Sequence, residues 1–434
     1  MPSSRRSSRP RSLVDSGLDL LSVSFGNKWL LTLVDQAIVS GASFLVGVIV
    51  GRVGGKEQLG LYVLGLTIIG LLMVLQDVLI WAPYTVFSPQ REGLEHALYT
   101  GSTLVHQLGL SALGILCLSG LGILLSWGWG PAGLKEVVLT LAIAGSFIAF
   151  REYIRQVCFA ALQFKVAIVI DGGTALVQCG ALLWLAYLDK VSASSAFLAI
   201  GLGCGLASLS WLVWARRSLA LSLPQIISDL GRNWSFGKWV LGTNLAEFAN
   251  WPLYQWILTG FSGVAALGTL SACQGVVSLT APFLFGTMNF LGPTSAHTLA
   301  QGGIQALRGF VAKSTLAIAA VCSLVCAIII VFGDQLVTLF YGPQYGGNHL
   351  PISLLAANSL VYALSLGVYY GIWALGRSDL TFKINLGLLV FTLTLGLVLV
   401  MVSGLLGVTL GLLAGNSAAL MLRYKFFKKL SNVA

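Results

Sequence analysis

Apolar runs longer than the roughly 20 residues needed to cross a bilayer recur along the whole chain. Only 9% of the 434 residues are Asp, Glu, Lys or Arg, whereas soluble globular chains carry about 25%. A sizeable soluble domain is therefore excluded. Because the runs are continuous, and are not alternating segments of about ten residues, they predict an all-α polytopic membrane protein rather than an outer-membrane barrel.

The chain length sets the number of spans. If each span with its loop takes about 30 to 36 residues, the chain holds roughly twelve. The expected spans are residues 29–51, 60–81, 98–127, 136–161, 166–188, 193–213, 236–260, 265–290, 311–336, 351–375, 380–401 and 405–422.

Basic residues predict the sidedness of these spans. Nineteen Lys and Arg residues fall on the side of the N terminus, and four fall on the other side: Arg52, Lys56, Lys135 and Lys190. Because short cytoplasmic loops retain Lys and Arg, both termini are expected in the cytoplasm. The same rule explains the net charge of +10, so we expect no nucleic-acid partner.

Four segments are expected along the chain. Residues 1–26 are a disordered basic tail, residues 27–214 an N-terminal six-helix lobe, and residues 215–235 a cytoplasmic linker. Residues 236–434 are a C-terminal six-helix lobe with a basic cytoplasmic tail. Leucines and isoleucines among polar residues in the linker predict an interfacial helix broken at Pro224.

An internal repeat relates the two lobes. Residues 45–60 align without gaps on residues 253–268, with identities at Leu45/Leu253, Ile49/Ile257, Gly55/Gly263, Leu59/Leu267 and Gly60/Gly268. An offset of 208 residues with six spans between predicts parallel repeats, which are related by a pseudo-two-fold axis along the membrane normal.

Charged residues inside the spans mark the candidate site, because each costs roughly 2.5 to 3.5 kcal/mol at a helix centre. Arg151 and Arg155 are one turn apart and share a helix face. Arg155 could pair with Asp171 and lock the hairpin of the fourth and fifth spans. Alternatively, the two arginines form a cationic wall that binds an anionic substrate, because the guanidinium fork matches phosphate oxygens. The seven charged residues are Asp35, Asp77, Arg151, Glu152, Arg155, Asp171 and Glu247.

Two further polar groups are candidates for proton or sodium coupling, or for binding sugar hydroxyls: Asp35 with Gln36, and Glu247 with Asn244. The alternative for each acid is a bond to a lysine near the membrane surface, Lys28 or Lys238. Asp77 is expected to be structural, and His106 is expected to be a hydrogen-bonded core histidine.

No motif predicts an enzyme or a cofactor. The chain has no Walker sequence, so no ATP hydrolysis is expected. Cys322 and Cys326 share a helix face, but no His or carboxylate accompanies them, so no metal site is expected.

Several runs resemble a known family. Residues 33–44 (LVDQAIVSGASF), residues 151–156 (REYIRQ) with Asp171, and residues 339–345 (LFYGPQY) are similar to the bacterial polysaccharide and O-antigen flippases. These belong to a superfamily that also holds the multidrug and toxic compound extruders and the lipid II flippases. The resemblance covers the full length loosely and the first third best.

The resemblance implies two lobes around a cavity that alternates between the sides of the bacterial cytoplasmic (inner) membrane. The implied cargo is an oligosaccharide joined through diphosphate to a polyprenyl lipid, for polysaccharide biosynthesis. Implied partners are membrane lipids and glycan polymerase machinery. The sequence departs from an equal two-lobe site, because Glu247 is its only clear cavity charge in the second lobe.

Two other functions stay open. A cation-coupled drug or metabolite antiporter of the same superfamily would favour acids that bind organic cations over an arginine pair. A membrane glycan ligase or polymerase would need an extended outer loop with catalytic groups. The longest outer connection, residues 334–349, contains no such cluster.

Overall fold

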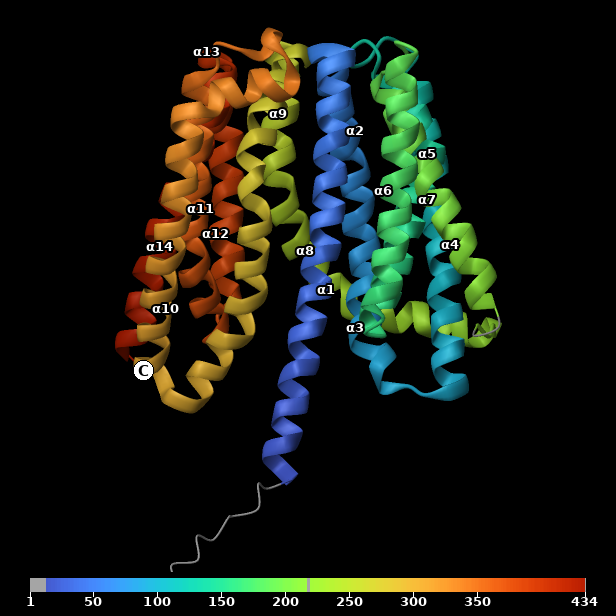
Figure 1. Ribbon diagram of the computed structural model, residues 1–434, viewed down its shortest axis with the longest axis vertical. Coiled ribbons are helices and arrows are strands. Elements are labelled where there is room, and N and C mark those ends of the chain that lie inside the picture. Colours follow the sequence, from blue (N-terminus) through green and yellow to red (C-terminus); the bar gives the residue numbers. More distant parts are fainter. Residues whose placement is uncertain (1–12, 217–218, 434) are drawn as a thin grey trace, which may run out of the picture.

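The computed structural model describes residues 13–216 and 219–433, and helices make up the fold throughout these residues, with no strand among them. Figure 1 shows two groups of roughly parallel helices, one on each side of the molecule. The helices are α1 (Leu13–Ile49), α2 (Gly55–Gln76), α3 (Ala82–Phe87), α4 (Gly93–Leu125), α5 (Leu134–Ala160), α6 (Phe164–Tyr187), α7 (Ala193–Ala215), α8 (Leu223–Ser262), α9 (Val264–Val277), α10 (Ala281–Tyr341), α11 (His349–Ala374), α12 (Ser378–Phe391), α13 (Leu397–Ser403) and α14 (Leu405–Val433).

Short turns of other helix types interrupt several of these helices. The π-helical turns Val50–Gly54, Asp77–Trp81 and Thr392–Gly396 follow α1, α2 and α12, and 3-10 turns lie at Ser88–Gln90, Ser278–Thr280 and Pro343–Tyr345. Pro282 lies in the first turn of α10, directly after the second of these 3-10 turns.

Twelve crossings follow from these helices. Ten stretches of the described chain are long and apolar enough to span a membrane, and one of them, Leu31–Gln90, contains both α1 and α2. Because Leu31–Gln90 crosses twice, the ten stretches give eleven crossings, and helix α8 gives the twelfth. Helix α10 includes a reversal at Gly303, with φ 66° and ψ −164°, where two helices meet. The chain is a multi-pass, all-α membrane protein, as the sequence predicts.

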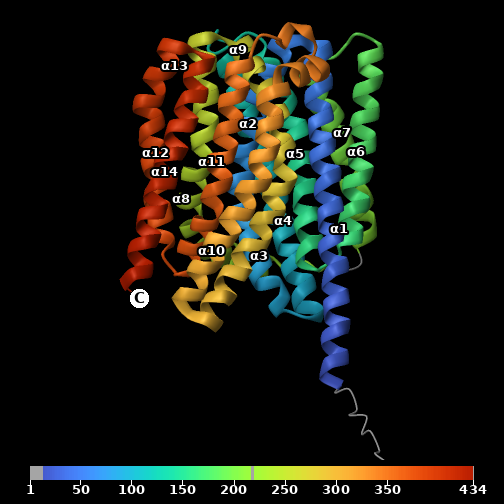
Figure 2. The same cartoon turned by 60° about the vertical axis from the view of Figure 1, so that its left-hand side comes forward.

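The two lobes are α1–α7 and α8–α14, and both views place the C terminus and the start of α1 at the same end of the bundle (Figures 1 and 2). We call this the termini end. At the opposite end α2 and α9 lie against each other, and we call this the seam end. One buried apolar cluster crosses between the lobes there, and it includes Leu64, Phe197, Leu267 and Tyr345.

Symmetric glycine contacts form the seam. A Cβ on Gly60 would lie 2.1 Å from the carbonyl oxygen of Val264, and one on Gly268 would lie 1.9 Å from that of Lys56. Each of these two pairs maps onto the other with the 208-residue offset of the repeat. Only glycine lets two backbones approach this closely, so α2 and α9 meet across a pseudo-two-fold axis.

The repeat also explains a second pair of glycines. Gly55 and Gly263 have φ of 83° and 84° with extended ψ, a conformation that disfavours any residue with a Cβ. Each glycine lies between an outgoing helix and the returning helix of its lobe. The two glycine identities of the repeat, Gly55/Gly263 and Gly60/Gly268, are therefore positions where the backbone requires glycine.

Two segment boundaries differ from the expected ones. Helix α1 begins at Leu13, inside the expected tail, because Leu18, Leu21 and Phe25 continue its apolar pattern; residues 1–12 lie outside the described part. Pro224 does not break a helix but lies in the first turn of α8, where the missing N–H is tolerated. Helix α8 then runs through the expected linker into the second lobe.

Candidate functional site

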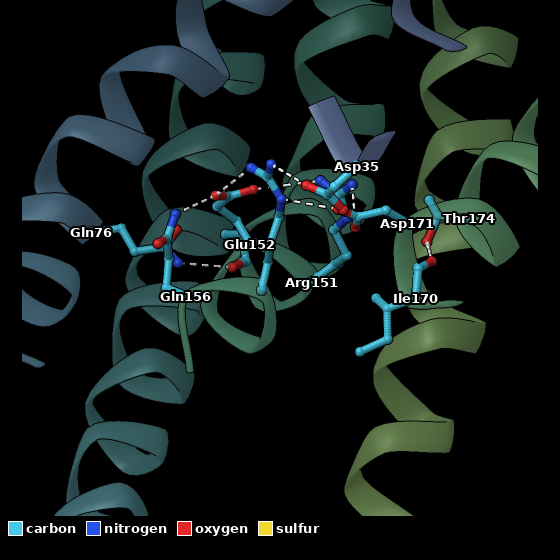
Figure 3. A network of polar contacts seen from close by, with 10 residues as sticks. Asp35, Gln76, Arg151, Glu152, Gln156, Ile170, Asp171 and Thr174 are labelled. Carbon is cyan, nitrogen blue, oxygen red and sulfur yellow. Dashed lines mark hydrogen bonds and ion pairs between the residues drawn. The ribbon is translucent and has the colours of Figure 1, made fainter. Parts of the chain in front are cut away.

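A buried ionic cluster lies in the first lobe, where α1, α5 and α6 meet. Arg155 of α5 donates from Nε to Asp171 Oδ2 at 2.9 Å and from Nη2 to Asp35 Oδ2 at 2.8 Å. Arg151, one turn earlier, places Nη2 at 2.6 Å from Asp171 Oδ1. The predicted pairing of Arg155 with Asp171 is confirmed, and Asp35 of α1 joins it (Figure 3).

A third carboxylate contacts both arginines. Glu152 lies 3.4 Å from Arg151 and 3.5 Å from Arg155, and it accepts a 2.7 Å hydrogen bond from Gln156 (Figure 3). Two guanidinium groups therefore face three carboxylates. The arginines do not form an open cationic wall in this conformation, because acids occupy their fork edges.

Close helix packing positions the cluster. A Cβ on Gly201 of α7 would lie 2.8 Å from the Cβ of Ala144, and one on Gly203 would lie 2.9 Å from the carbonyl oxygen of Thr174. Helix α7 therefore holds α5 and α6 at short distance, as small residues permit in membrane helices. Because Asp35 and Asp171 are each only 1% exposed, their charges depend on the arginines.

The cluster separates two cavities. One, of about 160 Å³, lies inside the lobe and is lined by Arg151, Asp171, Thr174 and Gln178 among others. The other, of about 300 Å³, is lined by Glu152, Gln156 and four residues of the second span and its π turn: Met73, Gln76, Asp77 and Trp81. Asp35 Oδ1 and Arg151 Nε are buried without a hydrogen-bond partner. The carboxylate oxygen of Asp35 can accept a proton or bind a cation, whereas Nε of Arg151 can only donate a hydrogen bond to an acceptor.

The other predicted site residues lie apart from this cluster. Gln36 donates to Ser40 on its own helix at 3.3 Å. Asn244 of α8 donates to Asp77, which links the two lobes, and Asp77 also lines the larger of the two cavities. Asp35 pairs with Arg155, whereas the side chain of Lys28 lies outside the described residues.

Glu247 is an exposed residue of α8 in the second lobe. The next residue, Phe248, places its ring against Gly70 of α2, so this part of α8 faces the first lobe. Glu247 interacts electrostatically with Tyr362, Tyr369 and Arg423 of the second lobe. It does not join the cluster of the first lobe.

Polar contacts close the seam end between the lobes. Arg52 donates to the carbonyl oxygens of Leu339 and Phe340 at 2.6 and 3.3 Å, which satisfies the last turn of α10. Tyr345 donates its hydroxyl to Gly51 at 3.0 Å. Burial raises the pKa of Tyr345 above its ordinary value, so this hydroxyl stays protonated at neutral pH.

A second set of contacts fixes the start of α8 beneath the first lobe at the termini end. Arg91 pairs with the fully buried Asp229 at 3.3 Å, and Tyr99 donates to Asn233 at 3.0 Å. His106 is hydrogen-bonded at 2.9 Å to the carbonyl group of Ile226. The predicted hydrogen bond of His106 is confirmed, and the residue is half-buried rather than part of the core.

Arg423 is a buried basic residue that the sequence pattern did not reveal. Its place after the last expected span predicts a cytoplasmic segment, but it lies inside the second lobe and is 9% exposed. A signal was present, because Asn416 and Arg423 are seven residues apart and share a helix face, and Asn416 lies within the mostly apolar first part of α14.

Comparisons with known proteins agree with this fold. A family model described as polysaccharide biosynthesis protein matches residues 90–348, more than half of the chain. The capsular polysaccharide biosynthesis protein CapF of Staphylococcus aureus is 31% identical over 111 residues, which span 25% of this chain and 27% of that protein. The match thus covers about a quarter of this curated relative.

Solved transporter structures share the fold over almost the whole chain. An inward-facing multidrug resistance MATE family transporter of the MOP superfamily has a TM-score of 0.76 at 14% identity, covering 92% of this chain and 95% of its own. An outward-facing structure with the same family description has a TM-score of 0.64 at 13% identity, covering 93% and 94%. The chain has the fold of these transporters, and it belongs to the polysaccharide biosynthesis protein family.

Proposed function

We propose that the chain is a flippase that moves a polyprenyl-diphosphate-linked oligosaccharide across the bacterial cytoplasmic membrane by alternating access. Family membership and the transporter fold support a membrane exporter. The observation that carries the finer proposal is the cluster of Arg151 and Arg155 beside the 300 Å³ cavity. With the termini end in the cytoplasm, the closed seam leaves this cavity on the cytoplasmic side.

The diphosphate would bind the two arginines by replacing a carboxylate. Asp171 and Glu152 now occupy the guanidinium edges at 2.6 to 3.5 Å. A phosphate group offers the same bidentate geometry with more charge. Protonation of an acid, or binding of sodium beside it, would release an arginine edge. Asp35 and Asp171 are therefore the proposed coupling residues of this lobe.

An apolar groove suits the lipid tail. It measures about 530 Å³ and lies between α1 and α10, with Leu33, Phe283, Phe290 and Ile318 among its lining residues. A polyprenyl chain buries only apolar surface, so this groove could hold the tail while the head group occupies the polar cavity.

The competing function is a cation-coupled multidrug antiporter. The specific observation in its favour is the excess of acids in the cluster, three against two arginines. Such a site would attract organic cations when its acids are ionised.

A disruption strain separates the two functions. Loss of a glycan flippase should leave lipid-linked glycan on the cytoplasmic leaflet, and the wild-type gene should restore export. Loss of an antiporter should instead sensitise the strain to cationic drugs, with normal glycan export. The second result would refute the flippase proposal.

A further inference from the structure

We propose that Arg423 forms a second anion-binding subsite, in the C-terminal lobe, for a phosphate or carboxylate group of the transported glycolipid. This inference rests on the proposed function, because it assigns a part of the same cargo to the other lobe. The chemistry common to both groups is an oxyanion that accepts hydrogen bonds from a guanidinium edge.

Arg423 has an unusual set of partners for a buried arginine. Its Nη1 donates to Ser365 Oγ at 2.5 Å and its Nη2 to Asn385 Oδ1 at 3.1 Å, so both partners are neutral. Among the described residues no carboxylate lies within ion-pair distance of it. Its Nε is buried without a hydrogen-bond partner. A buried charge left in this condition is costly, and an anion would neutralise it.

The arginines of the first lobe have partners of a different kind. Arg151 and Arg155 face three carboxylates, whereas Arg423 faces a hydroxyl, an amide and the ring of Tyr369, whose centroid lies 5.3 Å from the guanidinium. Neutral partners orient the guanidinium without cancelling its charge. Of these three arginines, Arg423 is therefore the one that is prepared for an anion in this conformation.

The position of Arg423 suits a cargo that contacts both lobes. It lies 18 residues from the start of α14 at the seam end, and Arg151 lies 17 residues from the start of α5 at the same end. At about 1.5 Å per residue, both lie roughly 26 Å below the seam. Glu247, which acts electrostatically on Arg423, is on the part of α8 that faces the first lobe.

A substitution at Glu247 should change anion affinity in the direction opposite to a substitution at Arg423. It is the acid that acts on Arg423, while Tyr362 and Tyr369 are the other titratable groups in electrostatic contact with it. A nearby negative charge opposes an incoming anion. Removing the charge of Glu247 should therefore strengthen binding without disturbing the bonds of Arg423.

The experiment measures binding of inorganic pyrophosphate and of glucuronate to the purified full-length protein by calorimetry. We expect Arg423→Gln to weaken binding of at least one probe by about 10-fold or more, because charge-assisted hydrogen bonds are lost. Arg423→Lys should lie between Arg423→Gln and wild type, and Glu247→Gln should bind at least about twofold tighter. The matched control is Arg377→Gln, because Arg377 is an exposed arginine at the termini end.

The two probes distinguish the sources of the anion. A loss confined to pyrophosphate assigns the subsite to the diphosphate, and a loss confined to glucuronate assigns it to an acidic sugar. The proposal is overturned if Arg423→Gln binds both probes with unchanged affinity. It is also overturned if Arg155→Gln loses affinity for a probe and Arg423→Gln does not. If Arg423→Gln does not fold, unchanged or weaker binding by Glu247→Gln overturns it instead.

Binding is measured without transport, so the two proposals fail separately. If the wild-type protein exports glycan and Arg423→Gln binds anions normally, only the proposed subsite is refuted. If the wild-type protein binds anions through Arg423 but exports no glycan, only the proposed flippase function is refuted.

Discussion

Arg155 joins three helices through two buried carboxylates, and the two acids do not depend on it equally. Asp171 keeps a second partner in Arg151 at 2.6 Å, whereas the ion pair of Asp35 is with Arg155. Removing Arg155 therefore leaves Asp35 as the uncompensated buried charge. Such a loss costs about 3 to 5 kcal/mol.

We predict that Arg155→Ala lowers the thermal stability of the purified protein strongly, and that adding Asp35→Ala restores more stability than adding Asp171→Ala. The control is Arg377→Ala. Its pair with Asp379 is about half exposed, so its loss should change stability by less than about 1 kcal/mol. Tryptophan fluorescence during heating measures the four variants. Better recovery with Asp171→Ala would show that the cluster depends on a different pair.

At the scale of single residues, the sequence reached the arginine pair and Asp171 because helical spacing and depth can be counted from it. It could not assign Asp35 to Arg155, since α1 and α5 are separated by more than 80 residues and their contact is set by lobe packing. Arg423 was missed for a related reason. A basic residue near the end of a span has the same sequence pattern whether it faces water or a buried polar pocket.

Helices α2 and α9 depend on the two seam glycines. A Cβ at Gly60 would lie 2.1 Å from a backbone oxygen, so the lobes must separate at the seam to accommodate it. We predict that Gly60→Ala lengthens the distance between spin labels at Glu57 and Gln344, two exposed positions at the seam end, as measured by electron paramagnetic resonance.

Gly41→Ala is the matched control for this seam variant. A Cβ at Gly41 meets no heavy atom within 4 Å, so the same substitution in α1 should leave the distance unchanged. Equal distances in Gly60→Ala and wild type would mean that the seam tolerates a side chain and is not held closed by backbone contact.

The repeat shows how far the elements could be predicted. The identities at Gly55/Gly263 and Gly60/Gly268 mark the matched turns and the seam from sequence alone. Helix ends were less predictable, because apolar residues continue the pattern of α1 back to Leu13 and α8 runs from Leu223 through the expected linker. Hydropathy identifies a span, but contacts such as Arg91 with Asp229 extend a helix beyond it.

The orientation of the protein in the membrane is a property of the whole molecule. The asymmetry of nineteen basic residues against four predicts that the termini end faces the cytoplasm. A reporter fused at Lys190, near the seam end, should therefore read as external, and one fused at Ala434 should read as cytoplasmic. The reverse pattern would place the seam on the cytoplasmic side and reverse the proposed access to the cluster.

The proposed function requires the two lobes together to carry a lipid-linked glycan across the bilayer. The most direct measurement places purified protein in vesicles with a polyprenyl-diphosphate oligosaccharide, and follows exposure of the glycan to a membrane-impermeant lectin.

We predict that wild-type protein exposes the inner-leaflet glycan well above the rate of protein-free vesicles. The variant Arg155→Ala/Asp35→Ala, recovered as folded protein, should not exceed that background. A correctly folded wild-type protein that leaves the glycan on its original leaflet, at the rate of protein-free vesicles, would contradict the proposed flippase function.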